Sequence, residues 1–308
     1  MTSLISIYRR FPDRGAAVAH LESVRWPDGP ICPYCASPKA SRNNDGSRTL
    51  TAARWQCQAC KRSYSVTVGT IFHGSHIDLQ RWYLLIALML NAKKGLSSMQ
   101  AARDLEMRQP TVWSMMQRVR AAMADDGALL AGLVEMDEAY IGGKPRKRNR
   151  RDDDGPPAPR GRATNKQPII GAVERKGRVK VKPASSERMA TSDMLALTRS
   201  WVAPGAVMHT DEYAGYNTLS HAYVSRRINH AQSYVEDDLF SGQYGRVHTN
   251  TIEGFWAIVK RAILGQYHHV SRKHLGGYLQ EIAWRYNHRS SRDAFADLLG
   301  AACNPQCV

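Results

Sequence analysis

Residues 133–143 read LVEMDEAYIGG, and this stretch decides the fold. Apolar and acidic side chains alternate from Leu133 to Asp137, as in a β-strand with one buried face, and Gly142-Gly143 closes the stretch. Neighbouring side chains of a strand point to opposite faces, so we predict that Glu138 faces away from Asp137. Glu135 shares the face of Asp137, and we predict an exposed strand residue there, with a role in supporting Asp137 as the alternative. We further predict that Asp137 ends the strand.

The sequence after this strand predicts a mixed α/β sheet. A hairpin with a turn at Lys176-Gly177 is expected over residues 168–183. Short strands are expected at 206–209 and 223–228, and helices at 191–201, 213–219, 250–264, 271–288 and 293–302. This order of strand, hairpin, helix, strand, helix, strand and long helix differs from a regular parallel β–α alternation.

Four of the six cysteines form two C-x-x-C pairs, Cys32/Cys35 and Cys57/Cys60, with 21 residues between the pairs. Each pair turns two thiolates toward one ion, and two pairs complete the tetrahedral set of a structural zinc site. Two disulfides or four free thiols are the alternatives, and the charged N-terminal segment, which does not resemble a secretory signal, argues against disulfides. We predict one zinc ion in an N-terminal helix and ribbon spanning residues 1–76.

A helix-turn-helix is predicted within residues 77–128. Ser97 or Ser98 would cap a short helix, residues 106–108 would form the turn, and Pro110 would open the second helix. In this motif the second helix enters the major groove of DNA. An ordinary packed pair of helices is the alternative. The predicted outward-facing DNA contacts are Thr111, Gln117, Arg118 and Arg120.

The charge of the chain is strongly positive and unevenly distributed. Lys and Arg number 43 against 27 Asp and Glu, a net charge of +16, which favours nucleic acid as a partner and an acidic membrane surface second. Residues 1–130 carry +8 and residues 144–167 carry +6. The longest apolar run, Trp82–Leu90, is nine residues, far short of the roughly 20 that span a membrane, so no membrane partner is expected.

The segment 144–167 is predicted to be an exposed and mobile loop, because it combines many charges with three prolines. It is either a solubilising linker or an arm that holds DNA. The basic residues for which we predict DNA contacts are Lys144, Arg146, Lys147, Arg148, Arg150 and Arg151.

Three acidic residues occupy positions where an α/β sheet presents polar groups to a shared crevice. Asp137 ends a predicted strand, Asp211 follows another, and Glu253 lies in the first turn of a predicted helix. Converging carboxylates suit Mg²⁺ or Mn²⁺, and two such ions about 3.5–4 Å apart promote phosphodiester chemistry. Lys260 lies within about 20° of Glu253 around the helix, and Asn250 shares this face. A solvated helix edge is the alternative for Glu253 and Lys260.

Several blocks resemble the zinc-ribbon DDE transposases of bacterial insertion sequences, the ISXO2-like family. The resemblance covers about residues 20–303. The blocks are RWPDG at 25–29, VEMDEAYIGGK at 134–144, HTDEYAGY at 209–216 and HTNTIEGFWAIVKR at 248–261.

The resemblance implies an RNase H-like catalytic domain over residues 131–303, behind the ribbon and the helix-turn-helix. Asp137, Asp211 and Glu253 would be its acidic triad and would hold two Mg²⁺ or Mn²⁺ ions, with Asn250 as the alternative third ligand. Lys260 would accompany the triad, and Lys260 and Arg261 are expected to contact DNA.

The implied function is that of a DNA transposase, which binds terminal inverted repeats, hydrolyses phosphodiesters at the element ends and joins the 3′-hydroxyls to target DNA. A homodimer or larger synaptic assembly is expected because two ends are joined in one event. Such a protein would work in the bacterial cytoplasm, associated with the nucleoid. The alternatives are a non-catalytic DNA-binding regulator and an RNase H-like nuclease without strand transfer.

Overall fold

The computed structural model describes residues 3–42, 54–142, 166–184, 191–212, 214–228 and 247–303. Two compact units form, one from residues 1–124 and 290–308, the other from residues 125–289. The predicted basic loop contacts at Lys144, Arg146, Lys147, Arg148, Arg150 and Arg151 lie outside the described residues. Among the described residues, no helix is long and apolar enough to cross a membrane.

The first unit combines a small three-stranded sheet with a cluster of helices. The sheet is antiparallel in the order β1-β2-β3, which is the arrangement expected of the ribbon. Its strands are β1 (Ala40–Arg42), β2 (Arg54–Cys57) and β3 (Ser63–Ser65), and its helices are α1 (Leu4–Arg10), α2 (Arg14–Arg25), α3 (Leu79–Asn91), α4 (Ser98–Asp104), α5 (Gln109–Ala122) and α9 (Ala294–Ala302).

The helices of this unit begin where the sequence provides caps. The carboxylate of Asp13 accepts a hydrogen bond from the backbone N–H of Ala16 at 2.8 Å, and the Ser97 hydroxyl accepts one from Met99 at 3.3 Å. Helix α2 is joined to the ribbon by Glu22, whose carboxylate accepts a hydrogen bond from the Trp55 indole at 2.8 Å. The predicted helix pair is therefore present as α4 and α5.

The last helix, α9, belongs to this first unit, although the predicted catalytic domain extended to residue 303. Phe295 of α9 is buried and packs against the rings of Phe11 and Tyr83, with centroids 6.4 and 5.5 Å apart. Aromatic burial of this kind removes a large apolar area from water, and it holds the C-terminal helix among the N-terminal ones.

The second unit contains a five-stranded sheet in the order β6-β5-β4-β7-β8. The pairs β6–β5 and β5–β4 are antiparallel, whereas β4–β7 and β7–β8 are parallel. The predicted mixed sheet is thus confirmed. The strands are β4 (Leu133–Ile141), β5 (Gln167–Glu174), β6 (Val179–Pro183), β7 (Val207–Asp211) and β8 (Val224–Ile228).

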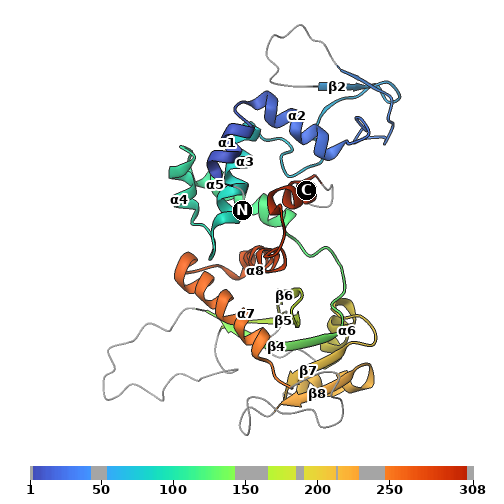
Figure 1. Cartoon of the computed structure of the whole chain (residues 1–308), viewed down its shortest axis with the longest axis vertical. Helices are drawn as coiled ribbons and strands as arrows, with labels where there is room; N and C mark the ends of the chain where they lie inside the picture. The colour runs from blue at the N-terminus through green and yellow to red at the C-terminus, as the bar shows by residue number, and fades with distance from the viewer. Residues whose placement is uncertain are drawn as a thin grey trace. The chain divides into compact units, whose positions relative to one another are not determined.

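Helices cover both faces of the sheet. Helices α7 and α8 lie over β4, β5 and β6 (Figure 1), and α6 and η3 pack on the opposite face. The elements are α6 (Thr191–Trp201), the 3₁₀ helix η3 (Ala214–His221), α7 (Asn250–Lys260), the π-helix η4 (Arg261–Tyr267) and α8 (Arg272–Asn287).

Strand β4 separates its side chains between these two faces. Val134 and Met136 pack with the core on the α6 side, and Ala139 and Ile141 pack with the core on the α7 side. Glu135 and Asp137 therefore face α7. The prediction that Asp137 ends the strand is wrong, because β4 continues to Ile141 along β5.

Candidate active site and zinc centre

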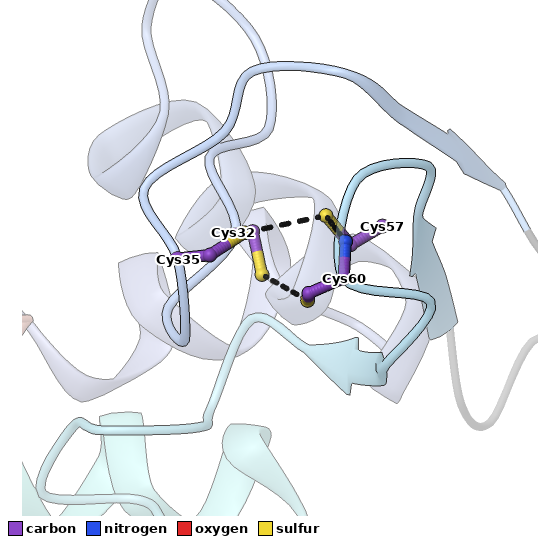
Figure 2. Close-up of side chains that lie close together, drawn as sticks. All are labelled: Cys32, Cys35, Cys57 and Cys60. Carbon is purple, nitrogen blue, oxygen red and sulfur yellow. Dashed lines mark hydrogen bonds between the residues drawn. The ribbon is translucent and has the colours of Figure 1, made fainter.

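The four predicted cysteine ligands converge in the ribbon. Figure 2 shows the two pairs facing each other, with Sγ atoms 3.7 Å apart for Cys32 and Cys60 and 3.6 Å apart for Cys35 and Cys57. All four sulfur atoms lie within 4.8 Å of one another. A tetrahedral ZnS₄ site with Zn–S bonds of about 2.3 Å requires sulfur atoms about 3.8 Å apart. The donor set thus fits a structural zinc ion, and the separations are far longer than a disulfide bond.

Each cysteine pair lies in a tight turn of its own, and the two turns have the same hydrogen-bond pattern. The N–H of Ala36 donates to the Cys32 carbonyl at 2.9 Å, and the N–H of Lys61 donates to the Cys57 carbonyl at 3.0 Å. Ala36 and Lys61 both have positive φ angles, 57° and 59°, which reverse the chain directly after each pair. Backbone N–H groups, that of Cys60 foremost, lower the pKa of Cys57 to about 6 and favour the thiolate that binds metal.

The predicted carboxylates meet at the α7 side of the sheet. The parallel pairing of β4 and β7 ends at Met136 and Thr210, so Asp137 and Asp211 are the next residues of two adjacent strands. Asp211 is half-buried at the end of β7, and Glu253 is exposed in the first turn of α7. The three side chains come from segments that are far apart in the sequence.

The electrostatics of Asp137 reflect this convergence. Burial, together with the negative charges of Asp211 and Glu253, raises the pKa of its carboxyl to about 6. Among the described residues, the four thiols are the only group of three or more potential metal ligands whose ligand atoms all lie within 4.8 Å of one another, so the three carboxylates do not all lie that close together. Three carboxylates at this spacing still form a concentration of negative charge that suits a hard divalent cation.

Trp256 holds Asp137 in place, and the sequence interpretation did not include it. The indole Nε1 donates a hydrogen bond to Asp137 Oδ2 at 3.0 Å. Gly171 lies directly opposite Asp137 on β5, and a Cβ there would come within 2.6 Å of the Trp256 ring. The glycine therefore provides the space in which the indole reaches the carboxylate. The position of Trp256 three residues after Glu253 is the only sequence signal for it.

Glu135 is also part of this region, and the prediction that it is exposed is wrong. The side chain is fully buried and forms an ion pair with Arg175, with Nε and Oε1 2.7 Å apart. Its carboxylate also accepts hydrogen bonds from the first turn of α7. Its place on the face of Asp137 was the signal from which a supporting role could have been inferred.

The remaining predicted residues of α7 lie on its exposed side. Asn250, Glu253 and Lys260 are exposed, as is Arg261 at the start of η4. The alignment of Glu253 and Lys260 on one side of the helix is thus compatible with both of the interpretations given for them, a phosphate track and a solvated edge.

Helix α5 corrects part of the predicted DNA surface. The apolar residues Val112, Met115 and Val119 are buried as expected, but Arg120 is only 2% exposed, so the prediction that it faces outward is wrong. Arg118 is half-buried; its guanidinium donates to the His73 carbonyl and lies over the Trp82 ring at 5.6 Å.

Fewer residues of α5 are exposed to solvent than predicted. Thr111 and Gln117 are half-buried, and Ser114 is exposed. The helical period identified the apolar stripe, but the neighbouring residues 118 and 120 are enclosed by packing within the unit.

Comparison with known proteins identifies the family. Residues 129–287 match the ISXO2-like transposase domain, and residues 12–63 match the transposase zinc-ribbon domain. The chain is 26% identical over 293 residues to the uncharacterized protein in transposable element ISH50 of Halobacterium salinarum, covering 90% of this chain and 92% of the relative. It is 29% identical over 98 residues to an uncharacterized transposase-like protein of Haemophilus influenzae, covering 32% and 72% of the two chains.

Two of the similar solved structures are complexes of the Mos1 transposase. The Mos1 mariner paired-end complex with Mn has a TM-score of 0.26 and 13% identity, over 69% of this chain and 77% of that one. The Mos1 strand transfer complex has a TM-score of 0.22 and 13% identity, over 73% and 80% of the two chains. The domain match covers more than half of the sequence and contains all three carboxylates. The chain therefore belongs to the ISXO2-like transposase family.

Proposed function

We propose that this protein is the DNA transposase of an insertion sequence, and that Asp137, Asp211 and Glu253 form its catalytic triad. The observation that carries this proposal is the convergence of the three carboxylates on the α7 side of the sheet. Asp137 and Asp211 directly follow the paired residues of two adjacent strands, and the charges of Asp211 and Glu253 add to burial in raising the pKa of Asp137. A structural packing role does not require three carboxylates on one side of a sheet, because uncompensated like charges oppose one another.

The triad would hold two Mg²⁺ or Mn²⁺ ions, which supply Lewis-acid stabilisation of the phosphodiester oxygens and activation of the attacking water or 3′-hydroxyl. The Trp256 indole holds the Asp137 side chain by a hydrogen bond, and Asp211 is the last residue of β7. Lys260, exposed two turns after Glu253, would bind a backbone phosphate of the DNA and orient the scissile strand. Asn250, on the same helix, is the alternative third ligand.

Recognition of the terminal inverted repeats is assigned to the first unit, through the ribbon and the helix pair α4–α5 acting as a helix-turn-helix. Thr111 and Gln117 stay as proposed DNA contacts on α5. Arg261 and the basic residues from Lys144 to Arg151 would bind backbone phosphates, since their positive charges suit the polyanionic backbone of DNA. A homodimer or larger assembly would pair the two ends, in the bacterial cytoplasm at the nucleoid.

The test uses the DNA that flanks the gene. Duplexes ending in the inverted repeats are incubated with purified protein, supercoiled plasmid and Mg²⁺ or Mn²⁺, and cleaved and joined products are separated on gels. We expect end cleavage and insertion into the plasmid, both abolished in D137N, D211N and E253Q while a mobility shift of the end DNA persists. The matched controls are E138Q and E212Q, which change the neighbouring carboxylates.

Each rival function gives a different pattern in this experiment. Cleavage without joined products would indicate an RNase H-like nuclease without strand transfer. Binding without cleavage under either metal would indicate a non-catalytic regulator. Cleavage that survives all three triad substitutions would overturn the assigned mechanism.

A further inference from the structure

A buried carboxylate lies on the same face of β4 as Asp137, two residues before it. Glu135 is fully enclosed, and its Oε1 accepts hydrogen bonds from Arg175 Nε at 2.7 Å and from the Thr251 hydroxyl at 2.8 Å. Its Oε2 accepts from the backbone N–H groups of Thr251 and Ile252 at 2.8 and 3.1 Å. A buried charge with this number of donors is stabilised where it is and cannot move without leaving donors unpaired.

These bonds make Glu135 the cap of helix α7. The first N–H groups of a helix have no partner within the helix, and a side chain at the N-cap residue usually accepts from them. The N-cap residue here, Thr249, makes no such bond, and its hydroxyl instead donates to Glu253 at 3.3 Å. The carboxylate of Glu135, from a strand 116 residues earlier, takes the place of a local cap and also complements the positive end of the helix dipole.

The same carboxylate is connected to strand β7 through Arg175. Arg175 Nη2 lies 3.2 Å from the Nδ1 of His209 and donates to the His248 carbonyl at 3.0 Å. His209 is fully buried and is the direct neighbour of Glu135 in the pairing of β4 with β7. Arg175 thus joins both strands to the segment that leads into α7.

The registers place this network directly beneath the three carboxylates. Asp137 lies two residues beyond Glu135 on β4, and Asp211 lies two residues beyond His209 on β7, so each shares a face with the residue below it. Glu253 lies in the helical turn whose N–H groups Glu135 accepts. Every element that carries a triad carboxylate is therefore joined to the ion pair of Arg175 with the buried Glu135.

We propose that Glu135 is a positioning residue of the active site, which sets the spacing of Asp137, Asp211 and Glu253 by capping α7 and by holding Arg175 against β7. The proposal rests on the proposed function, because it takes the triad to be a site for divalent metal. Glu135 itself does not touch DNA or metal, and its effect reaches the reaction through the geometry of the other three.

The test compares two buried Glu–Arg pairs of the same unit. Glu281 is also fully buried and is paired with Arg285 at 2.7 Å, with the Tyr267 hydroxyl 3.2 Å away, but it lies on α8, and neither of these two partners lies on a strand or helix that carries a triad carboxylate. In both E135Q and E281Q an amide NH₂ replaces an oxygen that accepts hydrogen bonds, so a merely structural cost falls on both variants. A milder second variant, T251V, removes one hydroxyl donor to Glu135.

Two readouts are measured on the full-length protein, namely Mn²⁺ binding followed by electron paramagnetic resonance and the Mn²⁺ dependence of end-DNA cleavage. For E135Q we expect the half-saturating Mn²⁺ concentration to rise at least tenfold in both, and for T251V about threefold. For E281Q we expect a lower melting temperature with Mn²⁺ dependence within twofold of the wild type. This pattern would support the positioning role, and T251V decides the question if E135Q does not fold.

Equal Mn²⁺ affinity in the wild type, E135Q and T251V would overturn the proposal and leave the transposase function intact. Equal weakening in E135Q and E281Q would also overturn it, because a general loss of stability would then suffice. If the wild type shows no Mn²⁺ binding that D137N removes, both this proposal and the proposed function fail.

Discussion

The two candidate metal centres of this chain are built in opposite ways. The zinc ligands come from two short turns, and each turn supplies two thiols separated by two residues. The carboxylates come from two strands and a helix, and successive members are 74 and 42 positions apart in the sequence. The first centre needs two tight turns that the ribbon brings together, whereas the second requires strands β4 and β7 and helix α7 to be in place.

The ligands also differ in what holds them. Four sulfur atoms within 4.8 Å leave room for one ion and no substrate, which is the arrangement of a closed structural site. The carboxylates are more widely spaced, and Glu253 is exposed. Neighbouring side chains hold the elements that carry them: the Trp256 indole donates to Asp137, and Glu135 accepts from the first turn of α7. An active site needs ligands that are accessible in this way, because a DNA phosphate must reach the ions.

The largest expected effect is the loss of the zinc centre. C57S should abolish zinc binding and unfold the ribbon, since structural zinc contributes on the order of 10 kcal/mol to the folding of such modules. Zinc per chain is measured by mass spectrometry, with thermal unfolding in parallel. C303S is the matched control, because Cys303 is a free thiol outside the cluster. One zinc per chain in C57S would show that four thiolates are not required.

The second effect is catalytic and should leave the zinc centre intact. D137N is expected to lower single-turnover cleavage on the order of 10³-fold or more, about 4 kcal/mol, because a metal ligand is lost. Its stability should hold or rise, since a buried carboxyl with raised pKa is replaced by a neutral amide. E138Q, on the opposite face of β4, should cleave normally, and comparable losses in both variants would contradict the assignment of Asp137.

The same contrast explains what the sequence could predict. Cys32, Cys35, Cys57 and Cys60 were identified from spacing alone because the spacing itself creates the site. Asp137, Asp211 and Glu253 are predicted from expected places at strand ends and a helix start, and the structure brings them together on the α7 side of the sheet, although Asp137 lies within β4 and not at its end.

The supporting residues were beyond the reach of local pattern. The burial of Glu135 depends on Arg175 and on the N-terminus of α7, which lie 40 and 116 residues away. The helical period predicts that Arg120 faces solvent, because the period separates apolar from polar residues. It does not show how much of the surface of α5 the neighbouring helices cover. Helix α9 joined the first unit for a similar reason, because the partners of Phe295 are near the N-terminus.

A third prediction concerns the packing that only the carboxylate centre requires. G171A should destabilise the second unit by about 1–3 kcal/mol, because the new methyl group would overlap the Trp256 ring. G254A on α7 is the control, since a Cβ there meets nothing within 4 Å and should be neutral or stabilising by up to about 1 kcal/mol. Urea denaturation measures both, and zinc content should stay constant. Equal stability in G171A and the wild type would show that Trp256 has room to move.

The smallest effect is the pH dependence of metal binding, which should separate the two centres within one protein. The pKa of Asp137 is raised to about 6, so protonation competes with Mn²⁺ below that pH and is negligible well above it. One competing proton should raise the half-saturating Mn²⁺ concentration about tenfold between pH 7 and pH 5, equivalent to about 1.4 kcal/mol. In the metal-free protein the sign for stability is the same as for any raised carboxyl: Asp137 favours folding below its unfolded pKa near 4, and this contribution is lost as pH rises through 6. Mn²⁺ titrations at each pH test the first claim, with D137N as the variant that should lose the pH dependence along with most of the affinity. If the Mn²⁺ affinity is equal at pH 5 and pH 7, protons do not compete with Mn²⁺ for Asp137, and its carboxylate is not a ligand of the ion.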